Sequence, residues 1–116
     1  MLLTIDPHGG RPLFEQVAAS VRTAIAAGRI ASGDRLPPAR EIAAGLGINL
    51  HTVLRAFQDL RDEGLIELRR GRGAVITPAA GALTELHADI TALVVRAAAM
   101  GLTPDTLAAL VKEHPA

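Results

Sequence analysis

The stretch LPPAREIAAGLGINLHTVLRAFQDLRDEGLIELRRGRGAVI, residues 36–76, decides the fold. Two prolines keep its start out of helix, and a short helix is then predicted over residues 39–46. The segment GLGIN at 45–49 breaks that helix, and Asn49 is a favourable N-cap for a second helix over residues 50–63. Apolar residues at helical spacing give this second helix a buried stripe, formed by Val53, Ala56, Phe57 and Leu60.

Two short β-prone runs close this stretch. LIELR at 65–69 and AVIT at 74–77 flank RGRG, which is typical of a hairpin tip because glycine tolerates turn geometry. Upstream, Pro12 opens a further helix, whose apolar residues recur at helical spacing until Gly28 ends it. The order helix, short helix, tight turn, helix and hairpin is typical of a winged helix-turn-helix, and we predict that domain over residues 1–78.

The pattern changes after Pro78. The small residues AAGA, 79–82, indicate a linker, and Gly101 and Thr103–Pro104 divide the rest into two helices. The first of these helices has apolar residues at heptad-like spacing, namely Leu83, Leu86, Ile90, Leu93, Ala97 and Met100. This seam either folds back on its own domain or meets its copy in a homodimer, and the homodimer is favoured because so small a domain has little free core to cover it. We predict a two-helix dimerisation tail over residues 79–116, in a fold that is mainly α with a small β-hairpin.

Composition narrows the class of protein. The 116 residues have a formal net charge of zero, but residues 1–80 hold ten Lys and Arg against eight Asp and Glu. Local potential rather than total charge attracts a polyanion, so nucleic acid is a plausible partner for the first portion. The chain has no Cys, no recognisable signal peptide and no apolar run long enough to span a membrane, which together predict a cytoplasmic protein.

Side chains at the start of the 50–63 helix are the candidates for reading DNA. A duplex major groove admits one α-helix, and the N-terminal residues of that helix then face the base edges. These residues are Asn49, His51 and Thr52, with Arg55 one turn further along. The alternatives are a solvated surface position for His51 and a helix-surface ion pair of Arg55 with Asp59.

The hairpin tip is the second candidate site. Arg69, Arg70 and Arg72 supply positive charge, and Gly71 lets the backbone approach a phosphate or the minor groove closely. Arg40, at the start of the 39–46 helix, is placed for a further phosphate contact. The alternatives are a charged turn with no partner, and an ion pair between Arg40 and its neighbour Glu41.

These elements resemble the GntR family of bacterial transcription regulators. Five separated motifs agree in order and spacing, L-P-x-x-R-E-[LI]-A, L-G-[VI], T-V-x-x-A-[YF]-x-x-L, E-G-L-[IL] and G-x-G, and the resemblance covers residues 12–77. The N-terminal IDPHGGRPLFEQV and the short tail are similar to the YtrA-type subgroup, in which a few dozen helical residues replace a large effector domain. The chain departs from the family at Leu50, where many members carry Arg, and at Pro38, where Ser is common. The resemblance implies DNA contacts at Arg40, Asn49, His51, Thr52, Arg55, Arg70 and Gly71.

From the residues and the resemblance we expect a homodimeric, sequence-specific transcription regulator that binds a pseudo-palindromic operator in double-stranded DNA. Repression is favoured over activation, and the YtrA-type resemblance implies control of a transporter operon, with sites near the regulator's own promoter. No catalytic set, metal-ligand cluster or cofactor motif is recognisable, so we expect no enzyme, metal or cofactor. The tail is too short to enclose a ligand pocket within one subunit, so a small-molecule effector would have to bind between subunits or between the tail and the DNA-binding domain. The alternative functions are a non-specific architectural DNA-binding protein and a winged-helix adaptor for protein interaction.

Overall fold

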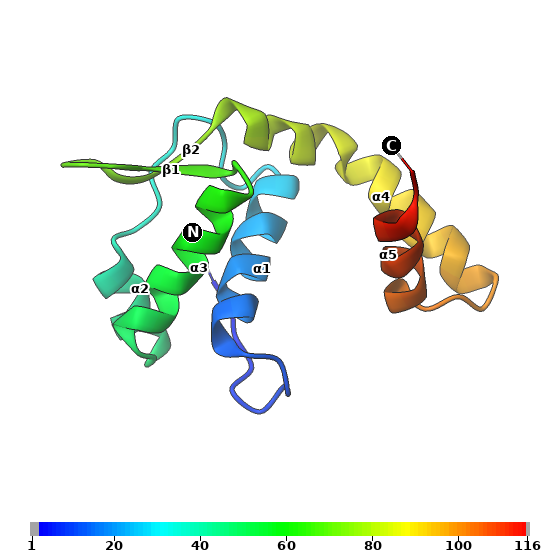
Figure 1. The fold of residues 1–116 in the computed structure, drawn as a ribbon, viewed down its shortest axis with the longest axis horizontal. Coiled ribbons are helices and arrows are strands. Elements are labelled where there is room, and N and C mark those ends of the chain that lie inside the picture. The colour runs from blue at the N-terminus through cyan, green and yellow to red at the C-terminus, as the bar shows by residue number, and fades with distance from the viewer. Residues whose placement is uncertain (1–2, 116) are drawn as a thin grey trace. The chain divides into compact units, whose positions relative to one another are not determined.

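The computed structural model describes residues 3–115, which divide into two units. The first unit runs to Glu85 and the second begins at Leu86, further along the chain than the predicted boundary after residue 78. The elements, labelled in Figure 1, are α1 (Leu13–Ala26), α2 (Ala39–Leu46), α3 (Leu50–Asp62), β1 (Ile66–Arg69), β2 (Gly73–Ile76), the 3₁₀ helix η1 (Pro78–Ala80), α4 (Gly81–Ala99) and α5 (Pro104–Glu113). The mainly helical fold with one hairpin is therefore confirmed.

The turn between α2 and α3 forms as its sequence predicts. Gly47 ends α2 in the left-handed conformation, with φ of 68°, which glycine adopts without a steric penalty. The Ile48 N–H donates back to the Ala43 carbonyl at 3.0 Å. Asn49 caps α3, since its Oδ1 accepts from the His51 backbone N–H at 2.7 Å. Three residues between the helices, Gly47, Ile48 and Asn49, thus suffice to pack α2 against α3.

One apolar core fills the first unit. α1 and α3 lie side by side, and α2 contacts α3 (Figure 1). The predicted stripes face inward, and Val17 and Val21 of α1 are fully buried together with Val53 and Leu60 of α3. Burying such a side chain contributes about 1.5–3 kcal/mol to stability. This core holds α3 rigidly while its opposite face stays exposed.

The hairpin gains a third pairing segment. β1 and β2 pair antiparallel, in a register that runs from Ile66 opposite Ile76 to Arg69 opposite Gly73. On the other side of β2, the Leu36 N–H donates to the Ala74 carbonyl at 2.9 Å, and residues 33–36 supply further backbone pairing. The prolines that follow Leu36 were predicted to keep this segment out of helix, but its pairing with β2 was not predicted. This pairing makes β2 the central strand. It fixes the base of the β1–β2 hairpin, which we call the wing.

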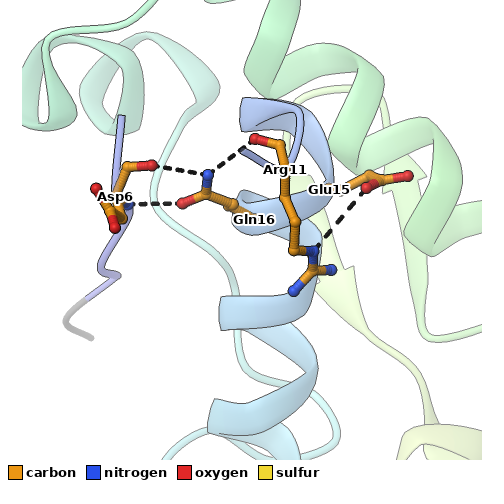
Figure 2. Close-up of polar contacts among 4 residues, drawn as sticks. All are labelled: Asp6, Arg11, Glu15 and Gln16. Carbon is orange, nitrogen blue, oxygen red and sulfur yellow. Dashed lines mark hydrogen bonds and ion pairs between the residues drawn. The ribbon is translucent and has the colours of Figure 1, made fainter. Parts of the chain in front are cut away.

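The side chain of Gln16 ties the N-terminal segment to α1, as Figure 2 shows. The Gln16 Oε1 accepts from the Asp6 backbone N–H at 2.6 Å, and its Nε2 donates to the carbonyls of Asp6 at 2.8 Å and Arg11 at 3.0 Å. Three backbone groups of a loop are thereby satisfied without a strand. Arg11 and Glu15, also drawn in Figure 2, form only a long, exposed ion pair at 4.0 Å, which contributes little to stability.

The expected linker at 79–82 is helical instead. η1 runs directly into α4, because three of these four residues are alanines, which favour helix, and Gly81 adopts helical dihedral angles. The Thr84 hydroxyl donates to the Ile25 carbonyl at 2.8 Å, near the end of α1. Leu83 packs against the core of the first unit. The first turn of α4 therefore belongs to the first unit.

The second unit contains the rest of α4 and α5. Gly101 turns the chain with φ of 84°, and the Thr103 hydroxyl caps α5 by accepting from the Thr106 N–H at 3.2 Å, as predicted. Ala97 is the one residue of the described part of this unit that is buried. Within residues 3–115 no single helix is both long and apolar enough to cross a membrane, and α4 and α5 meet that criterion only together, across a 120° bend.

Candidate nucleic-acid interface

The exposed face of α3 lies opposite its buried stripe. With Val53, Ala56, Phe57 and Leu60 turned inward, helical geometry puts His51, Arg55 and Gln58 on the outer side, and all three are exposed. α2 packs against α3 and leaves this outer side uncovered. The arrangement presents one helix face to a partner as a helix-turn-helix requires.

The N-terminus of α3 presents both donors and a positive dipole end. Asn49 uses its side-chain oxygen to cap the helix, so its amide NH₂ keeps two donors for other partners. Thr52, half-buried, and His51, exposed, follow in the first turn. Helix N-termini favour negative charge, including phosphate groups. The structure thus brings together the first three residues predicted to face a duplex.

Arg55 has an intramolecular partner that the sequence did not reveal. Its guanidinium carbon lies 3.7 Å from the centroid of the Phe14 ring on α1, which is a cation–π contact. The ion pair with Asp59 considered from sequence is not formed, because Arg55 makes no ion pair within the described residues. Arg55 therefore lies on the side of α3 that faces α1.

A second α1–α3 contact sits at the far end of α3. Arg22 donates through Nε to Glu63 Oε1 at 2.8 Å and forms a bidentate ion pair with this carboxylate. The hydrogen bond with Glu63 raises the pKa of Arg22 above its ordinary value, so the guanidinium stays charged at every physiological pH. Both side chains are more than a third exposed, so solvent screens the pair. The pair therefore contributes little to the stability of the fold.

The three wing arginines differ in their surroundings. Arg69 is paired within β1, where its guanidinium lies 2.6 Å from Glu67. Two residues apart on a strand, these side chains share one face of the hairpin, so strand periodicity alone could have indicated the pair. Arg70 and Arg72 at the tip are exposed and have no carboxylate at ion-pair distance in the part of the chain that the structure describes. They are the two tip charges left for an outside anion.

The backbone of the tip is open to close approach. Gly71 and Gly73 adopt φ of 80° and 70°, and the Arg72 N–H donates to the Arg69 carbonyl at 3.1 Å to close the turn. Nothing lies within 4 Å of the position that a Cβ would occupy on Gly71. Glycine is therefore required here for the turn conformation, and its lack of a side chain lets a partner reach the backbone.

Arg40 lies in the first turn of α2, where it is exposed. The alternative pairing with Glu41 is not seen, since Arg40 forms no ion pair among residues 3–115. Its guanidinium group therefore lies at the exposed N-terminal end of α2. The candidate positive groups therefore come from three elements of one unit: α2, α3 and the hairpin.

Comparison with known families identifies this arrangement. The profile of bacterial regulatory proteins of the gntR family matches residues 13–76, from the start of α1 to the end of β2. The chain belongs to the GntR family. It is a winged-helix, DNA-binding transcriptional regulator.

Relatives match beyond the GntR domain. The HTH-type transcriptional repressor YtrA of Bacillus subtilis is 31% identical over 118 residues, covering 97% of this chain and 91% of its own. The solved structure of YtrA from Sulfolobus acidocaldarius, a GntR-family transcription factor, is 31% identical, with a TM-score of 0.63 over 85% of this chain and 99% of that chain. The resemblance to the YtrA-type subgroup is thereby confirmed.

A further solved structure is a complex with an operator. The DNA-binding domain of AraR in complex with operator ORX1 is 25% identical to this chain, with a TM-score of 0.58 over 66% of this chain and 95% of that domain. The aligned portion thus has the fold of a domain that was solved on its operator.

The predicted seam residues do not share one environment. Leu83 packs against the first unit, and Ala97 is buried. The large side chains between and after them are exposed, and most of the exposed large apolar residues of the described chain belong to the second unit: Leu86, Ile90, Leu93, Val94, Val95, Met100, Leu102, Leu110 and Val111. An apolar surface of this kind is typical of an interaction site.

Proposed function

We propose that this GntR-family regulator is a homodimeric, sequence-specific repressor that binds a pseudo-palindromic operator. The observation that carries the proposal is the combination of the exposed face of α3 with the exposed charges of Arg70 and Arg72 on the adjoining hairpin. α3 enters the major groove, and the hairpin contacts the neighbouring backbone or minor groove.

The residues divide into two kinds of contact. We call α3 the reading helix and assign base-edge contacts to four residues at or near its start: Asn49, His51, Thr52 and Arg55. A second group supplies phosphate or backbone contacts, namely Arg40, Arg69, Arg70, Gly71 and Arg72. Of this group Arg69 contributes least in our assignment, because Glu67 already neutralises its charge.

Dimerisation is proposed through the second unit. The exposed apolar side chains of α4 and α5 suit a second copy of the same chain, because water contact with so many large apolar groups is unfavourable. The seam for this contact consists of Leu86, Ile90, Leu93 and Met100, without Leu83, which packs on its own first unit. Two copies then present two reading helices to half-sites one helical turn apart, or a multiple of it.

The regulatory role is proposed from the relatives. The Bacillus subtilis relative is named a transcriptional repressor, and its similarity extends along almost the whole chain. Repression then follows from occupancy, because a bound dimer blocks polymerase. We extend the YtrA-type resemblance to a transporter operon whose control region, next to the regulator's own promoter, carries the operator. A regulator of this kind acts in the cytoplasm, on chromosomal DNA, without catalysis.

Binding-site selection from random duplexes tests the proposal. The purified chain should enrich an inverted repeat, and the enriched duplex should bind at least a thousandfold tighter than a scrambled one at physiological salt. Mapping the repeat onto the genome should find it beside transporter genes. Equal affinity for selected and scrambled duplexes at every salt concentration would instead indicate a non-specific architectural protein.

A further inference from the structure

Two large apolar side chains are exposed on the described part of the first unit, and they lie together. Leu54 on α3 is 38% exposed and Leu68 on β1 is 43% exposed. Both line one hollow of about 410 Å³ between the reading helix and the wing, together with Phe57, Arg69 and Arg70. The hollow therefore combines large apolar side chains with two arginines, one of which, Arg69, is paired with Glu67.

Leu54 is not part of the core of its own unit. The buried stripe of α3 includes its neighbours Val53 and Ala56, while Leu54 lies one residue off that stripe. Three residues after His51 and four before Gln58, it shares a row with these two exposed polar residues. An apolar side chain therefore stands within the row that the helix offers to a duplex.

The side of α3 that faces the wing is thus different from the side that carries Arg55. Arg55 is held over Phe14 on the α1 side, and it does not line the hollow. Of the side chains of α3, Leu54 and the more deeply buried Phe57 are the ones that face the hairpin there. This side of α3 is apolar, so a DNA base can contact it favourably only through an apolar group.

We propose that Leu54 contacts the 5-methyl group of a thymine in each operator half-site and so determines specificity at that position. The proposal rests on the proposed function. In the major groove, the thymine methyl is the one apolar group that distinguishes a base pair. Arg70, which lines the same hollow, supplies the charge that draws the phosphate backbone over it.

The test removes a single methyl group. In the selected operator, each thymine is replaced in turn by deoxyuridine, which keeps base pairing and deletes only the 5-methyl. We expect one position in each half-site at which this change weakens binding about fourfold, the value of one buried methyl group. In Leu54→Ala the same change should have no effect, whereas Leu54→Met, which keeps an apolar contact, should retain part of it.

The controls separate this proposal from the broader one. Gln58→Ala, in the same row of α3, should leave the methyl effect unchanged. The proposal is overturned if no thymine methyl matters, or if the effect persists in Leu54→Ala at full size. Should Leu54→Ala fail to fold, the deoxyuridine scan on the unaltered chain and on Leu54→Met decides between the same outcomes. Failure of the selection to enrich any operator would instead reject the proposed function, and with it this proposal.

Discussion

Asn49 has one role that the structure shows and a second that we propose. Its Oδ1 caps α3 at 2.7 Å from the His51 N–H, and its NH₂ group is assigned to DNA. The two roles can be separated by substitution, because Ser also caps helices but lacks the amide.

Asn49→Ala should lower the free energy of unfolding by about 1 kcal/mol, the usual value of an N-cap. Asn49→Ser should stay within a few tenths of a kcal/mol of the unaltered chain and still bind the operator more weakly. Urea unfolding and a binding titration measure the two effects. Unchanged stability in Asn49→Ala would reject the cap, and unchanged affinity in Asn49→Ser would reject the DNA contact.

The Phe14–Arg55 contact links α1 to the reading helix through a single pair of side chains. Phe14→Leu keeps an apolar group but removes the ring face, and Arg55→Gln removes the cation. A double-mutant cycle on these changes should give a coupling of about 0.5–1 kcal/mol in the free energy of unfolding, as for exposed cation–π pairs. Pairing Phe14→Leu with Arg70→Gln, on the hairpin, serves as the control and should give a coupling near zero. A null result in the first cycle would mean that the contact contributes nothing.

At the scale of elements, the hairpin combines a fixed base with an open tip. β2 is paired on both sides, by β1 and by the segment at 33–36, so the base has little freedom. Gly71 and Gly73 shape the tip and leave its backbone accessible. The wing is consequently suited to sequence-independent contact, whereas the base-specific contacts are ones that we assign to α3.

Arg70→Ala and Arg72→Ala should each weaken binding to all duplexes alike. Each lost phosphate contact should reduce the slope of log affinity against log salt by about 0.9. Arg69→Ala should have a smaller effect, and Glu67→Gln should strengthen binding, because it releases Arg69 from its ion pair. Titrations at several salt concentrations measure all four variants. A slope unaltered by both tip substitutions would show that the wing does not touch the backbone.

At the scale of the whole molecule, the two units differ in how they bury apolar surface. The first unit has a closed core, whereas the described part of the second has Ala97 as its one buried residue. A helical unit with so little core of its own is stabilised by association. The apolar residues of α4 and α5 are therefore better explained by a partner copy than by the unit itself.

Ile90→Asp should convert the proposed dimer to a monomer, because it places a charge in the centre of the proposed seam. Sedimentation equilibrium should show the change in mass, and operator affinity should fall steeply, since a monomer holds one half-site only. Ala88→Asp, two residues away and on the opposite side of α4, is the matched control and should remain dimeric. Leu83→Ala should instead lower the free energy of unfolding of the first unit. Because Leu83 is only partly buried, the loss should be smaller than the roughly 2–5 kcal/mol of a fully buried leucine. A dimeric Ile90→Asp variant would contradict the proposed seam.

The sequence by itself determined the local structure of this protein. The bounds of α2, the Asn49 cap, the buried stripe of α3 and the two hairpin strands were all predicted, because caps, glycine turns and apolar periodicity act over a few neighbouring residues. The same local patterns carried the motifs of the GntR family, so the family and the fold class followed as well.

Only the tertiary structure decided which distant groups meet. Phe14 finds Arg55, residues 33–36 complete the wing, and Thr84 fastens the start of α4 to the end of α1. Each of these contacts joins segments that are far apart in the chain, so no local period or spacing encodes it. The hollow beside Leu54 arises in the same way, from the approach of α3 and the hairpin. Packing of the core sets how closely α3 and the hairpin approach each other, and so determines that the apolar side of α3 faces the hairpin.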